Sequence, residues 1–386
     1  MGQRPQRPEG NDCGRKGREA VSGMGKKALV AMSGGVDSSV AAALMKERGY
    51  DCIGVTMKLY EKEGGGTCRV GSCCTAEDAE DARQAASVLG IPYYVFNFTG
   101  DFEREVIRRF AETYLKGGTP NPCIDCNRYM KHRRLYQRAR ELGFDSIATG
   151  HYARVSFDAG RGRWLLKKAR NAAKDQSYVL YFLSQEQLSH SVFPLGDFET
   201  KEEVRELAEK LHFLNARKRD SQDICFVTEG DYGDFLESYL GRSFPPGNFV
   251  DEEGRILGHH RGIVRYTIGQ RKGLGLSLEA PMYVYGKDLL KNEVYLTRGE
   301  KLYQKELIAD DFNWILYDPS EIKGAIPVTA KSRYRAKEVP AEAELLPDGR
   351  VRVRFQEPER APAIGQAIVL YEGENVVGGG TIQSIS

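Results

Sequence analysis

Residues Ala28 to Ser39 read ALVAMSGGVDSS, and this stretch decides the fold. An apolar segment, expected to be a strand, runs into a glycine pair at Gly34 and Gly35, and a helix is expected to open at Asp37 and the serines after it. The glycines allow a tight turn because no Cβ is in the way. The N–H groups of the first helical turn then face outward at the positive end of the helix dipole. The pattern predicts a seat for a phosphate anion.

The same stretch also indicates which class of ATP-using enzyme is expected. No Lys-Ser or Lys-Thr pair follows the glycines, so a Walker A loop is disfavoured. SGGVDSS, residues 33–39, instead resembles the loop of enzymes that split ATP between its α and β phosphates and adenylate a substrate oxygen. A glycine turn in an ordinary strand-to-helix unit is the alternative, and the polar residues around the glycines argue against it.

Length and composition describe an ordinary globular chain. Its 386 residues are 41% apolar and 28% charged, with a net charge of +2, so two or three domains are expected. No apolar run reaches membrane-spanning length, and the eight irregularly spaced cysteines do not form a secreted disulfide framework. A cytoplasmic enzyme is therefore expected. The polar residues 1–24 predict a disordered tail, with Met24 as the expected natural start.

Strands and helices alternate after the loop. We expect helices over 38–48, 76–89, 102–115 and 127–142 and strands over 52–59, 92–98 and 146–149. This α/β alternation predicts a parallel sheet covered on both faces, with ligands beyond the carboxyl ends of its strands. After about residue 228, short strands separated by glycines predict an antiparallel barrel or sandwich.

Positive charge is concentrated in two segments. Residues 104–140 contain ten Lys or Arg against three acids, and residues 161–174 contain six against none. This distribution predicts a basic face for a polyanion larger than ATP. Cations that are balanced by acids in the folded protein are the alternative.

Three cysteines lie in contexts that indicate chemistry. Cys123 and Cys126 form CIDC in a proline-rich loop that enters a basic helix, and Cys225 follows 99 residues after Cys126. A cysteine before a helix N-terminus and beside Arg128 is expected to have a lowered thiol pKa and a larger thiolate fraction. Inert buried cysteines are the alternative, and a structural zinc site would lack a fourth ligand.

Nine segments match one family in order. They are SGGVDSS, CCTAEDAEDAR, TPNPCIDCNR, ATGHYAR, KDQSYVL, DSQDICFV, YTIGQRKGLG, KSRYRAK and IGQAIVLYEGENVVGGGTI. Together they resemble the tRNA-specific 2-thiouridylases, from Met24 to Ser386. The resemblance implies that ATP adenylates O2 of the wobble uridine of certain tRNAs, that pyrophosphate leaves, and that a cysteine persulfide delivers sulfur to C2.

The resemblance also implies an architecture and partners. The expected α/β fold has an N-terminal parallel-sheet PP-loop domain of the adenine nucleotide α-hydrolase kind, a small central domain and a C-terminal antiparallel β-barrel. The expected divisions are a tail over 1–24, the ATP pyrophosphatase domain over 25–228, a tRNA-contacting domain over 229–298 and the barrel over 299–386. The implied cofactors are ATP and Mg²⁺. The implied partners are tRNA and a persulfide carrier protein or cysteine desulfurase, with no part for DNA or a membrane.

Site residues carry over position by position. Cys126 matches the nucleophile and Cys225 the persulfide cysteine, and the two are implied to finish as a disulfide that must be reduced. The implied ATP-binding residues are Ala31, Met32, Ser33, Gly34, Gly35, Val36, Asp37, Ser38, Met57 and Gly150, with Asp37 a candidate Mg²⁺ or water ligand. The residues implied to contact the target base are Asn121, Pro122 and Cys123. Those implied to contact tRNA are His151, Lys174, Asp175, Gln176, Arg333, Tyr334 and Gln366, and the loop 266–275 is expected to join them.

The sequence departs from the family pattern at Cys123, where many members have aspartate. That aspartate is thought to contact the base and move protons, so the acid and base assignment is open here. The change also makes Cys123, Cys126 and Cys225 resemble the [4Fe–4S] ligands of related tRNA thiolases. Sulfide delivered by such a cluster is therefore an alternative to the persulfide.

Two other functions remain open. An amidotransferase-type synthetase that adenylates a small metabolite would need a glutaminase nucleophile or an ammonia source. A catalytically silent RNA-binding protein would have no need for an intact loop together with Cys126 and Cys225.

Overall fold

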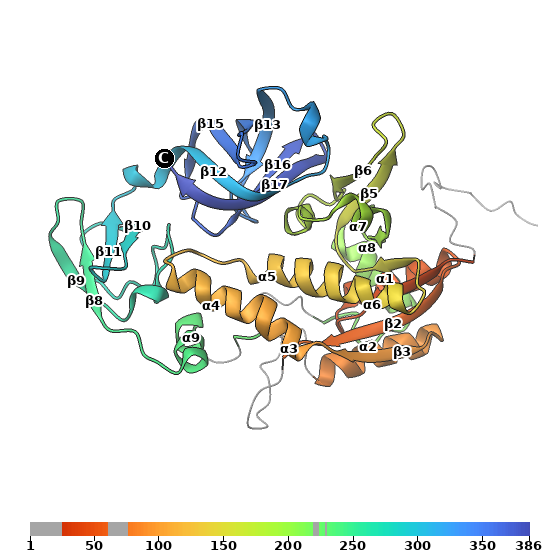
Figure 1. Cartoon of the computed structure of the whole chain (residues 1–386). Helices are drawn as coiled ribbons and strands as arrows, with labels where there is room; N and C mark the ends of the chain where they lie inside the picture. The colour runs from red at the N-terminus through yellow and green to blue at the C-terminus, as the bar shows by residue number, and fades with distance from the viewer. Residues whose placement is uncertain (1–24, 61–75, 219–223, 228–229) are drawn as a thin grey trace, which may run out of the picture.

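The computed structural model describes residues 25–60, 76–218, 224–227 and 230–386 (Figure 1). The tail expected over 1–24 and the proposed start at Met24 lie outside these residues. None of the helices in the described part of the chain is long and apolar enough to cross a membrane.

The N-terminal domain is built on a parallel sheet with the strand order β3-β2-β1-β4-β7. Its strands are β1 (Lys27–Ala31), β2 (Asp51–Lys58), β3 (Tyr93–Asn97), β4 (Ser146–Ala148) and β7 (Ser191–Val192). Its helices are α1 (Val36–Glu47), α2 (Ala76–Leu89), α3 (Thr99–Phe102), α4 (Arg108–Leu115), α5 (Pro122–Asp125), α6 (Tyr136–Glu141), α7 (Gln185–Ser189) and α8 (Lys201–Lys210), with a 3₁₀ turn over Ser177–Leu180. The predicted parallel sheet is confirmed.

Both faces of this sheet are buried because the side chains of β1 alternate between them. Ala28 and Val30 pack in a cluster with residues of α1, α2 and α8. Leu29 and Ala31 point the other way, into a cluster with residues of α4 and α6. The loop after β1 therefore emerges at the carboxyl edge of a rigid, doubly covered sheet.

Two long helical runs have π-helical middle sections. Glu103–Ile107 joins α3 to α4, and Cys126–Leu135 joins α5 to α6. The second run begins at Pro122, five residues before the predicted start at residue 127. Asn121 accounts for the difference, because its Oδ1 accepts the N–H of Ile124 at 3.3 Å and proline suits the first helical position. Cys126 thus lies in the second turn, and the expectation that it precedes the helix N-terminus was wrong.

The central part of the chain forms a small four-stranded sheet with the order β10-β11-β8-β9. It comprises α9 (Tyr232–Leu240), β8 (Gly247–Val250), β9 (Ile256–His260), the 3₁₀ turn Ile263–Arg265, β10 (Tyr283–Asp288) and β11 (Glu293–Thr297). Phe249 and Val294 share one hydrophobic cluster with Phe110 and Tyr114 of α4. The central sheet is therefore packed onto the N-terminal domain rather than tethered beside it.

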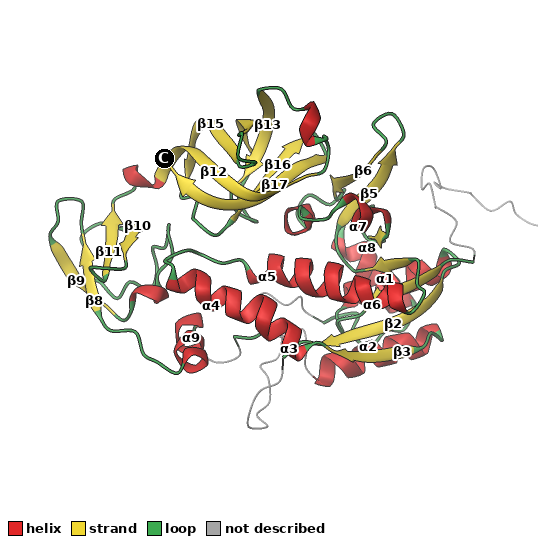
Figure 2. Cartoon of the chain, in the orientation of Figure 1, coloured by secondary structure: helices red, strands yellow, loops and turns green. Residues whose placement is uncertain are grey.

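The C-terminal part is a closed antiparallel barrel (Figure 2). Its strands are β12 (Tyr303–Trp314), β13 (Ala325–Lys331), β14 (Val339–Leu345), β15 (Val351–Arg360), β16 (Ala367–Glu372) and β17 (Asn375–Ile385), with 3₁₀ turns over Glu300–Leu302 and Pro319–Glu321. The sheet closes because β12 pairs with both β15 and β17. A hairpin of β5 (Ala153–Asp158) and β6 (Arg163–Lys168) joins it through the pair Asn375 and Lys167. The predicted barrel is confirmed.

Candidate ATP and sulfur-transfer site

The loop between β1 and α1 is held against the start of α2. Gly34 has a φ of +75°, and a Cβ there would lie 2.2 Å from the carbonyl oxygen of Asp78. Both its conformation and this close approach require glycine. The hydroxyls of the following helix brace the loop from inside: Ser38 Oγ donates to the Gly35 carbonyl at 2.9 Å and accepts the N–H of Ser33 at 3.1 Å.

Asp37, in the first turn of α1, is held by donors from two other elements. Lys201 Nζ donates to its two carboxylate oxygens at 2.6 and 2.7 Å, and the Tyr152 hydroxyl donates to Oδ1 at 2.7 Å. The side chain of Lys201 is only 6% exposed. The carboxylate thus accepts three hydrogen bonds within the protein, and its role as a Mg²⁺ or water ligand stays a prediction.

The two other residues expected to contact ATP lie in different settings. A Cβ at Gly150 would lie 2.8 Å from the backbone of Asp37 and Ser38, so the ATGH segment after β4 passes directly against the loop. Met57 lies in β2 and is 8% exposed, with its side chain in the hydrophobic cluster under the sheet. The structure therefore brings Gly150 to the loop and places Met57 in the core.

The two expected sulfur-transfer cysteines share one hydrophobic cluster. Cys126 and Cys225 are half-buried and pack against it. Phe226, beside Cys225, lies 5.2 Å from Phe110 and 5.8 Å from Phe102 between ring centroids. Residues 99 positions apart in sequence thus pack against one cluster, which extends from the N-terminal sheet to the central sheet.

Cys123 is exposed near the C-terminal barrel. Burial, together with the charges of Asp175 and then Cys123, raises the pKa of Tyr334, so these three side chains lie within electrostatic reach of one another. The charge of a residue expected to contact the base therefore acts on a residue expected to contact tRNA. Among the described residues, no three His, Cys, Asp or Glu side chains are placed to hold a metal, so Cys123, Cys126 and Cys225 do not form a cluster-ligand set in this conformation.

Three family models match consecutive parts of the chain. Their descriptions are tRNA methyl transferase HUP domain over residues 26–229, tRNA methyl transferase PRC-barrel domain over 233–298 and aminomethyltransferase beta-barrel domain over 304–382. The tRNA-specific 2-thiouridylase MnmA of Moorella thermoacetica is 52% identical over 93% of this chain and 99% of its own length. The protein of the same name from Acetivibrio thermocellus is 50% identical over the same shares.

The chain belongs to the tRNA-specific 2-thiouridylase family. The family resemblance seen in the sequence is confirmed, and the chain is an enzyme of the tRNA sulfurtransferase class. A solved 4-thiouridine synthetase–RNA complex with bound ATP aligns with a TM-score of 0.35 and 19% identity over 56% of this chain and 51% of that one, a likeness too low to support any conclusion.

Several residues of this thiouridylase that were expected to contact tRNA make hydrogen bonds within the protein. His151 is buried and bonds Thr149 Oγ1 through Nδ1 at 2.7 Å, and burial lowers its pKa well below the usual value. Asp175 accepts the Ala169 N–H at 2.9 Å, and Gln176 accepts the Tyr152 N–H at 3.0 Å. Arg333 donates to the Arg360 carbonyl at 2.7 Å, and Gln366 donates to the Thr119 and Pro120 carbonyls at 3.0 Å. The Lys174 N–H donates to the Asn171 carbonyl at 3.1 Å. Direct tRNA contacts by these residues stay predictions.

The basic segments of the thiouridylase are largely balanced by acids. Arg104, Arg108, Arg109, Arg134 and Arg138 pair with acids on the helices, and Arg161, Arg163, Lys167, Lys168 and Arg170 pair with Asp158, Asp318, Glu374, Glu338 and Asp197. Much of the charge segregation seen in the sequence thus disappears on folding. Lys116, Arg133 and Arg140 are exposed and have no ion pair with a described residue, so they contribute to the positive field that remains.

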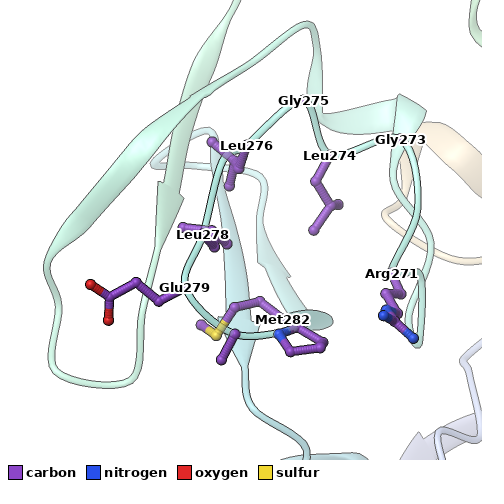
Figure 3. A pocket seen from close by; sticks show the side chains of 10 residues that line it. Arg271, Gly273, Leu274, Gly275, Leu276, Leu278, Glu279 and Met282 are labelled. Carbon is purple, nitrogen blue, oxygen red and sulfur yellow. The ribbon is translucent and has the colours of Figure 1, made fainter.

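The glycine-rich loop expected to touch tRNA lines a pocket in the central sheet region. The pocket has a volume of about 320 Å³ and is lined by Arg271, Gly273, Leu274, Gly275, Leu276, Leu278, Glu279, Ala280, Pro281 and Met282. Leucine, methionine and proline side chains line it together with Arg271 and Glu279, which lie on opposite sides (Figure 3). A contact of this loop with tRNA stays a prediction.

Sequence reasoning missed three residues, Lys201, Asn215 and Lys218, which bond the phosphate loop, the helix after it and the start of α2. Besides Lys201, Asn215 Nδ2 donates to the Gly34 carbonyl at 2.9 Å and to Ser39 Oγ at 3.0 Å. Lys218 Nζ bonds Asp78 at 2.7 Å, which ties the same segment to the start of α2. No local pattern marks these residues, because each acts across more than a hundred positions of sequence.

Asp125, beside Cys126, gives a pH-dependence prediction. Burial raises the pKa of its carboxyl to about 6, against the opposing pull of Arg109 and Arg128. This folded pKa lies above the unfolded value of about 3.9. The contribution of Asp125 to the free energy of unfolding is therefore full below about pH 4, and it is lost as the pH rises through 6. Asp125→Asn should therefore gain on the order of 2 kcal/mol relative to wild type between pH 4 and pH 8. Denaturant melts across this range measure it, and parallel pH profiles of the two proteins would refute it.

Proposed function

We propose that this enzyme catalyses ATP-dependent 2-thiolation of the wobble uridine of tRNA, in the cytoplasm where tRNA is found. Two features support the proposal most: a phosphate-type loop at the carboxyl edge of the sheet, and two cysteines 99 residues apart that pack against one hydrophobic cluster. The loop suits activation of an oxygen, and the cysteines suit delivery of sulfur. The identity to named 2-thiouridylases over nearly their whole length supports the same substrate.

Activation comes first in the proposed reaction. The backbone N–H groups of residues 34–37 hold the β and γ phosphates of ATP, while uridine O2 attacks the α phosphorus and pyrophosphate leaves. Lys201 bonds both oxygens of Asp37 and so offsets the negative charge of this carboxylate beside the phosphates. Mg²⁺, bound chiefly through ATP oxygens, would neutralise charge on the leaving pyrophosphate.

Sulfur transfer follows at C2 of the adenylated uridine. A carrier protein or desulfurase loads Cys225 as a persulfide, whose terminal sulfur displaces AMP from C2. Cys126 thiolate then attacks the inner sulfur of Cys225, which forms the Cys126–Cys225 disulfide and leaves the transferred sulfur on the uridine. A reductant restores the two thiols. Asn121, Pro122 and Cys123 lie at the entrance to this helix, where an extruded base would need contacts to its edge.

The division of labour among the parts of the chain is also part of the proposal. Residues 25–228 carry both chemical steps, while residues 229–298 and 299–386 bind the tRNA body. The Cys123, Tyr334 and Asp175 grouping supports this, because it sets a barrel side chain beside the residues proposed for the base. Sulfide delivery by a [4Fe–4S] cluster is the second candidate. It is favoured only by the three-thiol sequence pattern, since those thiols are not gathered as ligands here.

One assay separates the candidate functions. Enzyme is incubated with ATP, Mg²⁺, a persulfide donor and unmodified tRNA, and the digested tRNA is analysed for 2-thiouridine. Bound tRNA without product would favour a silent RNA-binding protein, and tRNA-independent pyrophosphate release with a small acceptor would favour a synthetase. Full activity in aerobic, iron-free enzyme would exclude the cluster, whereas activity that follows iron content after anaerobic purification would exclude the persulfide route.

A further inference from the structure

The segment that carries Cys123 and Cys126 is fastened to the C-terminal barrel at both ends. Before it, Gln366 Nε2 donates to the carbonyl oxygens of Thr119 and Pro120 at 3.0 Å each. After it, the two terminal guanidinium nitrogens of Arg128, Nη1 and Nη2, bond the carboxylate of Asp311, with Nη2 to Oδ1 at 3.1 Å. Asp311 and Arg128 are 183 positions apart. Figure 1 shows the barrel lying over α5, where this segment begins.

The upstream contact is a close approach of two backbones. The Thr119 N–H donates to the Ile364 carbonyl at 2.8 Å. This backbone hydrogen bond adds to the two that the Gln366 side chain makes. A Cβ at Gly365, which has a φ of +89°, would lie 3.1 Å from the Thr119 carbonyl oxygen. A Cβ at Gly118 would lie 3.2 Å from the Ile364 carbonyl oxygen. The barrel loop therefore sets where the chain enters the helix of the nucleophile.

The downstream contact uses a special backbone position. Asp311 has a φ of +49° and lies in a bulge of β12, where the register with β17 shifts between Asp310 and Asn313. Aspartate tolerates this left-handed conformation better than most residues. The Asp311 side chain is 58% exposed and that of Arg128 29%, so the pair adds little to the free energy of unfolding. What a two-pronged Arg–carboxylate pair supplies is a fixed orientation.

We propose that Asp311 and Gln366 are positioning residues for the sulfur-transfer nucleophile, an inference that rests on the proposed role of Cys126. Arg128 is two residues after Cys126, near the start of a π-helical section, a geometry that is rare and often found at functional sites. Holding Arg128 from outside fixes the rotation of that turn, and Gln366 fixes its entrance. The barrel thereby sets the orientation of the Cys126 thiol, in addition to any contact that the barrel makes with tRNA.

Asp311→Asn tests the downstream contact, since asparagine keeps the shape and the tolerance for positive φ but removes the charge. Glu374→Gln is the matched control: Glu374 is a barrel carboxylate, 49% exposed, that pairs with Arg154 and Lys167 away from the nucleophile. Gln366→Met removes the upstream donor at similar length, and Asp311→Glu is the conservative rescue. Each full-length variant is assayed for thiolation kcat, KM for tRNA and the alkylation rate of Cys126 by iodoacetamide, read by peptide mass spectrometry.

We expect Asp311→Asn to lower kcat about tenfold and leave KM for tRNA within about twofold, because small misplacements of a reacting group are costly while binding is untouched. The alkylation rate of Cys126 should change about threefold or more in Asp311→Asn and Gln366→Met, return toward wild type in Asp311→Glu, and stay unchanged in Glu374→Gln. Unchanged alkylation and kcat in both variants would overturn the proposal, as would a loss confined to KM, which would make Asp311 a tRNA contact. Alkylation needs no turnover, so it tests positioning even if no 2-thiouridine is formed and the proposed function fails.

Discussion

Cys126→Ser is expected to abolish formation of 2-thiouridine, by at least about 10³-fold, while tRNA binding stays intact. A serine hydroxyl is scarcely ionised near neutral pH and cannot form the disulfide with Cys225 that releases the transferred sulfur. Because activation is assigned to a different part of the site, the variant should still form an adenylated tRNA. Nucleoside mass spectrometry measures the product, and a filter-binding titration measures the tRNA affinity.

Cys52→Ala is the matched control for this variant. Cys52 is buried, burial raises the pKa of its thiol to about 11, and its Sγ contacts the Tyr50 carbonyl at 3.5 Å, on the opposite side of the sheet from the Cys126 cluster. Its replacement should cost some stability and leave turnover per folded molecule unchanged. Cys225→Ser should match Cys126→Ser in product and differ in losing the persulfide itself. Substantial thiolation by either variant would remove that cysteine from the role given to it.

Gly34→Ala is expected to eliminate ATP-dependent activation, with tRNA-dependent pyrophosphate release below about 1% of wild type. The added Cβ would stand 2.2 Å from the Asp78 carbonyl oxygen, a backbone atom that cannot swing aside as a side-chain end could. The loop or the start of α2 must therefore shift, and with it the N–H groups that face the phosphates. The φ of +75° adds roughly 1 kcal/mol of strain for any residue with a Cβ.

Gly90→Ala is the control that separates backbone strain at a positive φ from the steric clash of an added Cβ. Gly90 follows α2 with a φ of +62°, and the nearest atom to an added Cβ is Lys46 Nζ at 3.7 Å, the movable end of a side chain. The variant should therefore lose stability comparable to the strain part of Gly34→Ala and keep its activity. Pyrophosphate release by folded Gly34→Ala at the wild-type rate would show that the loop does not need the geometry described here. Thermal melts of both variants confirm that folded protein is compared.

The sequence was a good guide where local pattern decides structure. Strands β2, β3 and β4 lie within one residue of the predicted ranges because each is an apolar run bounded by turns. Helix α2 matches its prediction, whereas the helix of Cys126 was placed five residues late. The Asn-Pro pair at its start was taken as loop, although a side-chain cap followed by proline is itself a helix-start pattern.

The misses share a physical cause, which is that they depend on contacts made only in the folded chain. The run 161–174 was interpreted as a basic face, yet its cations meet acids such as Asp318 and Glu374 of the barrel. Burial of His151 depends on the packing of β4 and Phe193, which no local pattern reveals. Lys201 lies in an amphipathic helix that has no loop signature, so its bond to Asp37 could not be foreseen.

An isotope measurement tests the central claim, that ATP activates the oxygen which sulfur replaces. A tRNA with ¹⁸O at O2 of the target uridine is thiolated by the enzyme, and the AMP and pyrophosphate are analysed by mass spectrometry. The account predicts one ¹⁸O in AMP for each 2-thiouridine formed, because O2 leaves bonded to the α phosphorus. AMP without label, label in pyrophosphate, or ADP as the nucleotide product would contradict it.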